Sequence, residues 1–342
     1  MYHSSVSTLH VTNGSSAGDT LATFVDGRVA ITCDVLHEGP APRVDGEVWY
    51  ETRATFLADG NESNVDEIGA SLARGDREIT DAAAHDDIVL WFEHDLFDQL
   101  LLIRTLDLIG GSKRTRPTEP DRVGRVLPDP AAVSLICIDR FPGVERFIGL
   151  GQLTGDQLAS LYPSRRRVTT DQYALASRAW DAFRSPDPTQ VPVIARDAAA
   201  LPFLGDALLR FLADYPSTTN GLSRTEELAL LALGGAPMTA GTLFAATQRH
   251  EPRPFMGDLP FYDVLRTLAA ARVPLVALDA SARGGNLRDV PVSITDTGRD
   301  VVSGRRDHVV LNGIDRWKGG VHLMGDSGSP WRWDAARETL VS

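Results

Sequence analysis

Short apolar runs, each followed by a polar turn and then by a helical pattern, recur through the N-terminal part of the chain. The runs Thr8–Thr12, Val29–Cys33, Ile88–Phe92 and Ala132–Ile138 predict buried strands, because most of them are continuous rather than alternating. The intervening residues are helix-prone, most clearly in the leucine-rich segment Leu96–Ile109. Strands that alternate with helices are typical of a mainly parallel sheet with helices on its faces.

The chain becomes predominantly helical after residue 148. Capping-box matches at Thr154 and Ser223 mark two predicted helix starts, and Asp171–Phe183 predicts a further helix. Three C-terminal helical segments precede two strand-like segments, Pro274–Leu278 and Val290–Ile294, which is the order of a winged helix. We therefore predict the α/β class with three parts: a mainly parallel sheet domain at 1–148, a helical middle at 149–216, and a winged-helix-like α+β module with a Trp-rich tail at 217–342.

Composition and charge narrow the class of protein. The chain has 342 residues, of which 43% are hydrophobic and 23% charged, as in ordinary soluble globular proteins. A net charge of -12 disfavours general binding to nucleic acid or to an anionic membrane, since both need a positive surface. No secretory signal or membrane-spanning run is visible, and Cys33 and Cys137 lie in apolar runs as expected of reduced core thiols. We expect a cytoplasmic protein.

Ionisable residues follow three of the predicted strands. They are Asp34, His37 and Glu38 after the second strand, Glu93, His94, Asp95 and Asp98 after the third, and Asp139 and Arg140 after the fourth. Open α/β sheets bind ligands beyond the carboxyl ends of their strands. Several carboxylates gathered there would repel one another unless protonation or a divalent cation relieved the repulsion.

We therefore expect Asp34, Glu93 and Asp95 to hold a divalent cation. Oxygen ligands favour Mg²⁺ or Mn²⁺, whereas a histidine ligand would admit Zn²⁺. For each acid alone, the alternative is a solvated cap that stabilises the N-terminus of the following helix. Three junctions that all carry acid or histidine favour a functional crevice over three independent caps.

The proton-transfer candidates are His37, His94 and Glu38. Histidine is the side chain that most often acts as a general acid or base. Each of the two histidines follows a predicted strand, and the near-neutral pKa of the imidazole suits proton transfer. We expect one of the two imidazoles to serve as the general acid or base.

The substrate-binding candidates are Asn13, Ser15, Ser16 and Arg140. The first three form the turn after the first strand, where backbone N–H groups could bind a phosphate; a plain turn with a serine cap is the alternative. This turn matches neither the dinucleotide fingerprint nor the Walker pattern, so neither a nicotinamide nor a flavin motif is present. Arg140 could bind an anion or pair with Asp139.

One basic run, Arg165–Arg167, interrupts the acidic composition. Its simplest interpretation is a solvated turn between helices. It is also the best local candidate for a contact with phosphate or nucleic acid.

Three sequence blocks, His10–Gly14 (HVTNG), Asp34–Pro40 (DVLHEGP) and Trp91–Gln99 (WFEHDLFDQ), stand out together. They resemble the signature blocks of a bacterial family described only as domain of unknown function 1835. Further blocks, among them Gly149–Leu153, extend the resemblance over nearly the whole chain. The family's first block usually reads Asn-Gly-Asp-Ser, whereas this chain has Ser15 in place of the acid. The resemblance implies homology and no particular activity.

These observations predict an enzyme, a hydrolase or transferase acting on a small phosphorylated or nucleotide-like molecule. The alternatives are a ligand-sensing winged-helix transcriptional regulator and a non-catalytic interaction protein whose acids only cap helices. The net charge, and Arg266 as the only basic residue in the predicted recognition helix Phe261–Ala271, favour the enzyme over a DNA reader. The C-terminal module would then mediate a protein contact, with a homodimer as one arrangement.

Overall fold

The computed structural model describes residues 7–32, 34–58, 64–81, 85–114, 132–278, 287–325 and 330–342, with the side chains of 112–114 excepted. Cys33, the last residue of the second predicted strand, lies outside these ranges. The chain divides into two compact units, the first formed mainly by residues up to Asp187 and the second mainly by Leu208 to the C-terminus. Among the helices described, none combines the length and apolar character needed to cross a membrane.

A five-stranded sheet forms the centre of the first unit. Its strands are β1 (Thr8–Asn13), β2 (Arg28–Thr32), β4 (Asp87–Glu93), β5 (Ala132–Ile138) and the short β6 (Arg166–Arg167). Their order is β2-β1-β4-β5-β6, and the first four are parallel while β6 runs antiparallel to β5. The prediction of an α/β protein with a mostly parallel sheet is thus confirmed.

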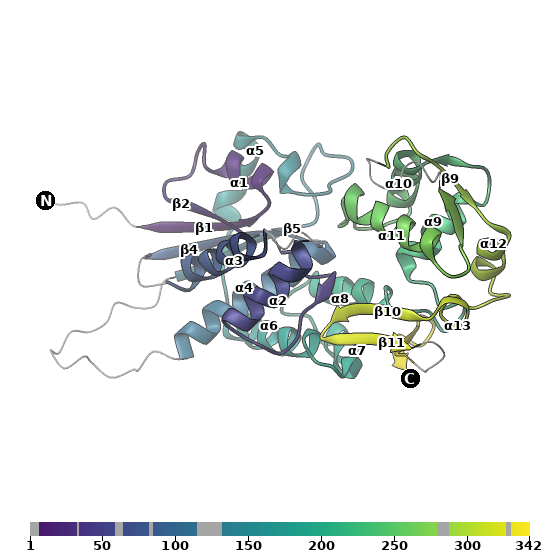
Figure 1. Ribbon diagram of the computed structural model, residues 1–342. Helices are drawn as coiled ribbons and strands as arrows, with labels where there is room; N and C mark the ends of the chain where they lie inside the picture. Colours follow the sequence, from purple (N-terminus) through teal and green to yellow (C-terminus); the bar gives the residue numbers. More distant parts are fainter. Residues whose placement is uncertain are drawn as a thin grey trace, which may run out of the picture. The chain divides into compact units, whose positions relative to one another are not determined.

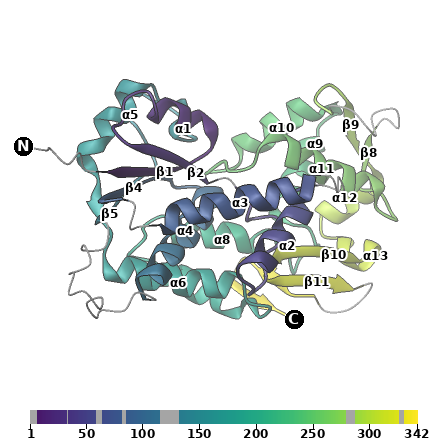
Figure 2. The same cartoon turned by 60° about the vertical axis from the view of Figure 1, so that its left-hand side comes forward.

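Helices cover both faces of this sheet (Figure 1). One face carries α1 (Ser15–Leu21) and α5 (Gly155–Leu161), and the other carries α3 (Val65–Thr80) and α4 (Leu96–Arg114). Figure 2 shows the same two layers from another side. The first unit also contains β3 (Gly39–Pro40), α2 (Glu47–Leu57), α6 (Thr170–Phe183) and the 3-10 helices Leu150–Gln152 and Tyr162–Ser164.

Strand β4 lies in the interior of the first unit. Its residues are almost all buried, so side chains of both parities meet packed helices. Val89 and Trp91 belong to the cluster under α1 and α5, together with Leu158. Because side chains alternate along a strand, Glu93 projects to the same face as Trp91.

Several elements agree closely with the sequence-based expectations. The strands Thr8–Asn13 and Ala132–Ile138 and the helix that begins at Leu96 are confirmed. The capping boxes of Thr154 and Ser223 are both formed. The predicted domain boundaries at 148 and 216 stay predictions.

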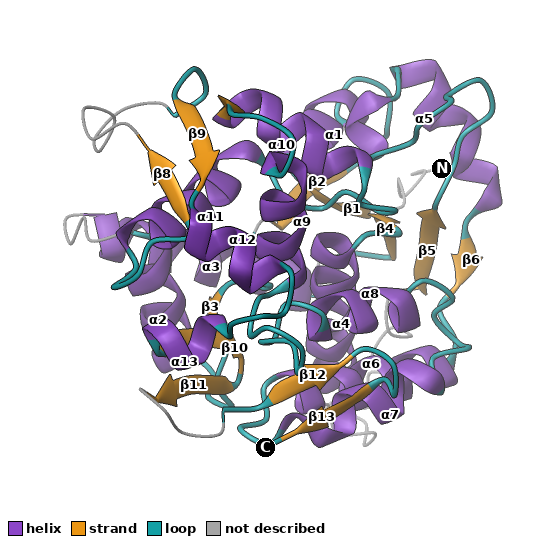
Figure 3. Cartoon of the chain, turned by 90° about the vertical axis from the view of Figure 1, so that its right-hand side faces the viewer, coloured by secondary structure: helices purple, strands orange, loops and turns teal. Residues whose placement is uncertain are grey.

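The second unit is mainly helical with small sheets (Figure 3). The elements from residue 191 onward are α7 (Val191–Arg196), α8 (Leu204–Leu212), α9 (Arg224–Leu233), β7 (Met238–Thr239), α10 (Ala240–Arg249), α11 (Asp258–Ala270), β8 (Val276–Leu278), β9 (Pro291–Ile294), α12 (Asp296–Val302), α13 (His308–Asn312), β10 (Ile314–Gly319), β11 (Val321–Gly325), β12 (Arg332–Asp334) and β13 (Thr339–Val341). Strands β7, β9 and β8 form an antiparallel sheet in that order. Its core includes Leu230, Leu243, Phe261 and Val292.

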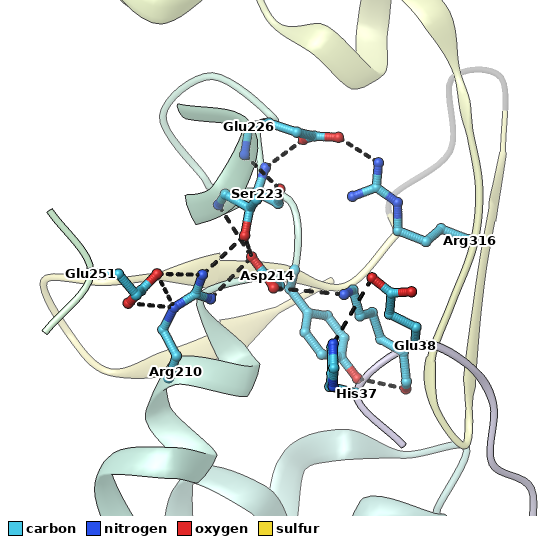
Figure 4. A network of polar contacts seen from close by, with 11 residues as sticks. His37, Glu38, Arg210, Asp214, Ser223, Glu226, Glu251 and Arg316 are labelled. Carbon is cyan, nitrogen blue, oxygen red and sulfur yellow. Dashed lines mark hydrogen bonds and ion pairs between the residues drawn. The ribbon is translucent and has the colours of Figure 1, made fainter. Parts of the chain in front are cut away.

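A network of paired charges lies inside the second unit (Figure 4). Asp214 is buried, with Arg210 Nη1 at 3.1 Å and Lys318 Nζ at 3.8 Å from its oxygens. Arg210 also reaches Glu251 at 2.9 Å, and Glu226 of the α9 capping box meets Arg316 at 2.5 Å. Each buried carboxylate therefore has a cationic partner, as buried charges require.

In the first unit, the buried carboxylate of Asp34 likewise has an arginine as its partner. Arg53 on α2 is fully buried, and its Nη2 lies 2.6 Å from Asp34 Oδ1 while its Nε donates to both carboxylate oxygens. The guanidinium also donates to the backbone carbonyls of Val35, Glu38 and Pro40. One arginine thus ties α2 to the whole loop that follows β2.

We expect Arg53→Met to lower the free energy of unfolding by about 3–5 kcal/mol, because it leaves the Asp34 carboxylate buried without its partner. The measurement is urea-induced unfolding of the variant beside the wild type. Arg305→Ala is the matched control, since it removes an exposed pair with Asp300 and should cost less than about 1 kcal/mol. Equal effects of the two substitutions would contradict this role of Arg53.

Candidate functional site

The order in which the chain adds strands to the sheet changes direction between the parallel neighbours β1 and β4. From β1 the chain passes to β2 on one side, and it later returns to β4 and β5 on the other side. In open α/β sheets, ligands bind beyond the carboxyl ends of the strands at such a switch point. Asn13 ends β1 and Glu93 ends β4, so these two residues lie at that point.

Three acidic side chains meet at the end of β4. Each of Glu93, Asp95 and Asp98 offers a carboxylate oxygen, and these oxygens all lie within 4.8 Å of one another. Their residues are only 7%, 4% and 1% exposed. We call these three residues the acid cluster.

The acid cluster differs from the other buried acids of the protein. Asp34, Asp76 and Asp214 each form an ion pair with a buried or nearly buried arginine. Among the residues that the structure describes, no lysine or arginine nitrogen lies within 4.0 Å of an acid-cluster oxygen. The negative charge of this cluster is therefore not balanced by a side-chain cation in the described part of the chain.

Neutral donors position the carboxylates instead. Asp98 accepts hydrogen bonds from the backbone N–H of Glu93 at 3.0 Å and from Asn13 Nδ2 at 2.5 Å. Asp95 Oδ1 accepts from the backbone N–H of Asp98 at 2.9 Å, in the manner of a helix cap. Gln99 Nε2 donates to the carbonyl of Glu93 at 2.5 Å. The capping interpretation thus holds for Asp95, while its carboxylate also belongs to the cluster.

A glycine-rich segment before α5 closes over Glu93. The backbone N–H of Leu150 donates to Glu93 Oε1. A Cβ atom at Gly149 would lie 2.5 Å from Glu93 Oε2, and one at Gly151 would lie 3.0 Å from Ser16 Oγ. A larger residue at position 149 would therefore require the Glu93 carboxylate to shift.

Burial and mutual repulsion make protons bind tightly to the acid cluster. Burial, with the charges of Asp98 and Asp95, raises the pKa of Glu93 to about 10. Burial and the charge of Asp98 raise the pKa of Asp95 well above its usual range. Burial raises the pKa of Asp98 to about 6, although the hydrogen bond from Asn13 acts in the opposite direction. Without a cation, the cluster therefore retains protons at neutral pH.

The prediction that Asp34 would share a cation site with Glu93 and Asp95 needs correction. The carboxylate of Asp34 is held by Arg53 through both oxygens, and it is not among the gathered acids. Asp98 takes its place in the cluster. Asp98 follows Asp95 by one helical turn, which brings both carboxylates to the same helix end.

The predicted proton-transfer residues lie against aromatic rings. His37 is buried, its ring centroid is 5.7 Å from that of Phe97, and its Nε2 lies 4.0 Å from Glu38 Oε1. His94 lies near the rings of Phe147 and Phe203, with centroid distances of 6.0 Å and 6.1 Å. Their catalytic roles stay predictions.

The predicted substrate-binding residues fall into two groups. Asn13 joins the acid cluster through Asp98, and Ser16 Oγ donates to the carbonyl of Gly151 at 3.3 Å, while Ser15 is exposed. Helix α1 has only seven residues and no side-chain cap at its N-terminus. Arg140 is exposed and forms a two-point contact with Asp139 at 2.9 and 2.8 Å, which was the predicted alternative to anion binding.

Sequence reasoning placed Asp98 in the general group of strand-end acids without choosing it as a ligand. It also passed over Gln99, Gly149 and Leu150. The spacing Asp95 to Asp98 at the start of a helix was the available signal for Asp98. No local pattern marked Leu150, because its role depends on a contact 57 positions away along the chain.

No protein-family model matches the chain, and no curated protein matches it. Among solved structures, the chain is similar to the DNA-binding, cleavage and re-ligation domain of Plasmodium falciparum topoisomerase II, with a TM-score of 0.41 and 10% identity. The match covers 86% of this chain and 48% of that chain, so this chain spans about half the length of the structure it matches. A likeness at this level carries no argument, and the resemblance to domain of unknown function 1835 stays a prediction.

We expect the metal-free protein to lose stability as the pH rises from about 4 to about 8. The raised pKa values of Glu93 and Asp98 mean that the native state keeps protons that the unfolded chain has released. Their contribution is fully present below the unfolded pKa values and is lost as the pH rises through about 6 for Asp98 and about 10 for Glu93. Each such proton contributes a slope of up to about 1.4 kcal/mol per pH unit.

The measurement is urea-induced unfolding in a chelating buffer across this pH range, for wild type, Glu93→Gln and Asp98→Asn. Both substitutions should flatten the profile. Asp139→Asn is the control, because the hydrogen bond from Arg140 lowers the pKa of Asp139 and its contribution therefore has the opposite sign. Other groups with lowered pKa values, such as Glu226 and His308, make stability rise with pH, so the comparison with the variants is decisive. A wild-type profile that runs parallel to those of Glu93→Gln and Asp98→Asn would exclude proton storage by the acid cluster.

Proposed function

We propose that this protein is a metal-assisted hydrolase or transferase that acts on a small phosphorylated or nucleotide-like substrate. The observation that carries the proposal is the acid cluster, three buried carboxylates within 4.8 Å of one another beside the switch point of a parallel sheet. Three buried charges of the same sign are unfavourable unless protons or a cation reduce them. This unfavourable burial of like charges occurs at the end of the sheet where ligands bind. We therefore favour a functional role of the acid cluster over a purely structural one.

The donor atoms of the cluster fit a hard divalent cation. Glu93, Asp95 and Asp98 supply carboxylate oxygens, and Asn13 approaches Asp98 from β1. Oxygen donors of this kind are the ligands of Mg²⁺ and Mn²⁺, whereas Zn²⁺ prefers nitrogen and sulfur. We therefore favour Mg²⁺ or Mn²⁺ over Zn²⁺.

Each group near the cluster has a definable part in such a reaction. A bound divalent cation would polarise a phosphoryl oxygen and lower the pKa of a bound water. Asn13 would hold Asp98 in place, and Ser16 would offer its hydroxyl to the substrate from the turn after β1. His94 lies between two members of the cluster in the sequence, so its imidazole is our candidate for the general acid or base.

The ligand-sensing regulator is the second candidate. Helices α9, α10 and α11 followed by the antiparallel strands β8 and β9 support a winged-helix-like interpretation of the second unit. The charge of α11, which would be the DNA-reading helix, argues in the other direction. Arg266 on α11 is already paired with Asp263 at 2.5 Å, and the protein carries a net charge of -12. A DNA-binding surface needs more phosphate-neutralising charge than this.

We expect Mg²⁺ or Mn²⁺ to raise the thermal unfolding temperature of the metal-stripped protein. A ligand that binds only the folded state, present at 100 times its Kd, stabilises it by about 2.7 kcal/mol. The Glu93→Gln/Asp95→Asn variant should lose this response, while Asp139→Asn, which changes a partly exposed acid that follows β5 and pairs with Arg140, should keep it. Phosphoester and nucleotide hydrolysis would then be screened with the ion that stabilises.

The response to cations decides between the candidates. If neither ion stabilises the wild type, or if the double variant responds equally, the metal-assisted reaction is excluded. A ligand-sensing role without a metal would then be examined first.

A further inference from the structure

A cavity of about 800 Å³ opens at the amino end of the sheet, where β1 and β2 begin. It is lined by Ser7, Thr8, His10, Phe24, Val25, Asp26, Gly27, Ala159 and Tyr162. The acid cluster instead meets Asn13 at the carboxyl end of β1. The cavity and the acid cluster therefore involve opposite ends of the same strand, and the proposed cation site does not account for the cavity. Its volume is within the usual range of small-molecule pockets, about 300–1,000 Å³.

The buried side of the cavity is uncharged. His10 is 1% exposed, and its Nδ1 accepts a hydrogen bond from Trp91 Nε1 at 3.1 Å. Its other ring nitrogen therefore carries the proton, and the ring also hydrogen-bonds to the backbone of Asp26. Burial, and to a smaller extent the charge of Arg165, lowers the pKa of His10, which keeps the ring neutral. A neutral part of a ligand suits this end of the cavity.

Aromatic rings form part of the wall. Phe24 and Tyr162 both line the cavity, and the Tyr162 ring lies nearly parallel to that of Trp91, with a centroid distance of 6.2 Å and an angle of 21°. His10 lies 6.0 Å from the Tyr162 ring. Rings held by packing in this way present a preformed surface to a planar ligand.

A cation is fixed beside this aromatic wall. The guanidinium of Arg165 lies 4.0 Å from the centroid of the Tyr162 ring, and its Nη1 donates to the carbonyl of Tyr162 at 2.9 Å. Arg165 is exposed and begins the basic run Arg165–Arg167 in a protein with a net charge of -12. A guanidinium held over a ring keeps further N–H donors in a planar fork suited to phosphate.

The cavity also contains a hydrogen-bond acceptor. Asp26 lines it and is exposed, so its carboxylate can accept hydrogen bonds from the hydroxyls of a ligand. Arg165 does not line the cavity itself, but its guanidinium lies over the Tyr162 ring, which does. The aromatic wall, the Asp26 carboxylate and this arginine together match the base, ribose and phosphate of one nucleotide.

We propose that this cavity binds a nucleoside monophosphate, with the base against Phe24 and the part of the Tyr162 ring that Arg165 does not cover, the ribose at Asp26 and the phosphate at Arg165. The site is separate from the acid cluster and does not rest on the proposed reaction. Nucleotide binding at the amino end of the sheet would leave the acid cluster free for its own ligand.

The test is isothermal titration of the full-length protein, in a chelating buffer, with AMP, GMP, CMP and UMP as probes. At least one of them should bind. Ala159→Trp places an indole in the cavity and should weaken that binding about tenfold or more. Ser160→Trp is the matched control, since Ser160 is exposed on the same helix and does not line the cavity, and it should bind like the wild type.

Two further variants test the assignment of the groups. Arg165→Gln should remove the preference for the monophosphate over the corresponding nucleoside. Tyr162→Leu should weaken both ligands, and it replaces Ala159→Trp if that variant does not fold by circular dichroism. The proposal is overturned if no monophosphate binds at millimolar concentration. It is equally overturned if binding survives both cavity variants, or if binding is lost instead in Glu93→Gln/Asp95→Asn, which would place the nucleotide at the acid cluster.

Discussion

The repulsion among three buried carboxylates is the constraint on which the first unit depends. Glu93, Asp95 and Asp98 lie within 4.8 Å of one another where little water reaches them. Such a group stays buried only if protons or a cation reduce its charge and if donors reach its oxygens. The donors come from four places in the chain: Asn13 at the end of β1, the backbone of Glu93 at the end of β4, the first turn of α4, and the backbone of Leu150. The sheet order, the helix start and the glycine at 149 all meet this one requirement.

The protein handles buried charge in two different ways. Asp34 and Asp76 in the first unit and Asp214 in the second are neutralised by arginine, which makes them structural elements that hold helices and loops together. The acid cluster is stabilised by neutral donors, so its charge stays adjustable by protons or by a ligand. This contrast separates the acids that support the fold from those to which we assign a chemical role in our proposal. It also explains why an acid at a strand end is not by that position alone a functional residue.

Strand β1 connects two environments with opposite character. At its amino end His10 is a neutral ring bonded to Trp91, beside a cavity with aromatic walls. At its carboxyl end Asn13 donates to a carboxylate with a raised pKa. Since Trp91 and Glu93 project to the same face of β4, the two environments adjoin the same layer of the sheet. The amino and carboxyl ends of the parallel strands present different groups. One sheet can therefore support two chemically distinct sites.

The sequence by itself determined the buried strands β1, β4 and β5, the start of α4 and the presence of acids at the strand ends. These features depend on local patterns, since continuous apolar runs bury strands on both faces and an acid before a helix caps it. Only the tertiary structure decided which acids meet. Asp34 is taken by Arg53, 19 positions away on α2, whereas Asp98 is joined to Asn13 across 85 positions. The cavity beside His10 likewise combines side chains from β1, the turn before β2 and the end of α5. Such pairings follow from strand order and helix packing, which no local pattern in the sequence records.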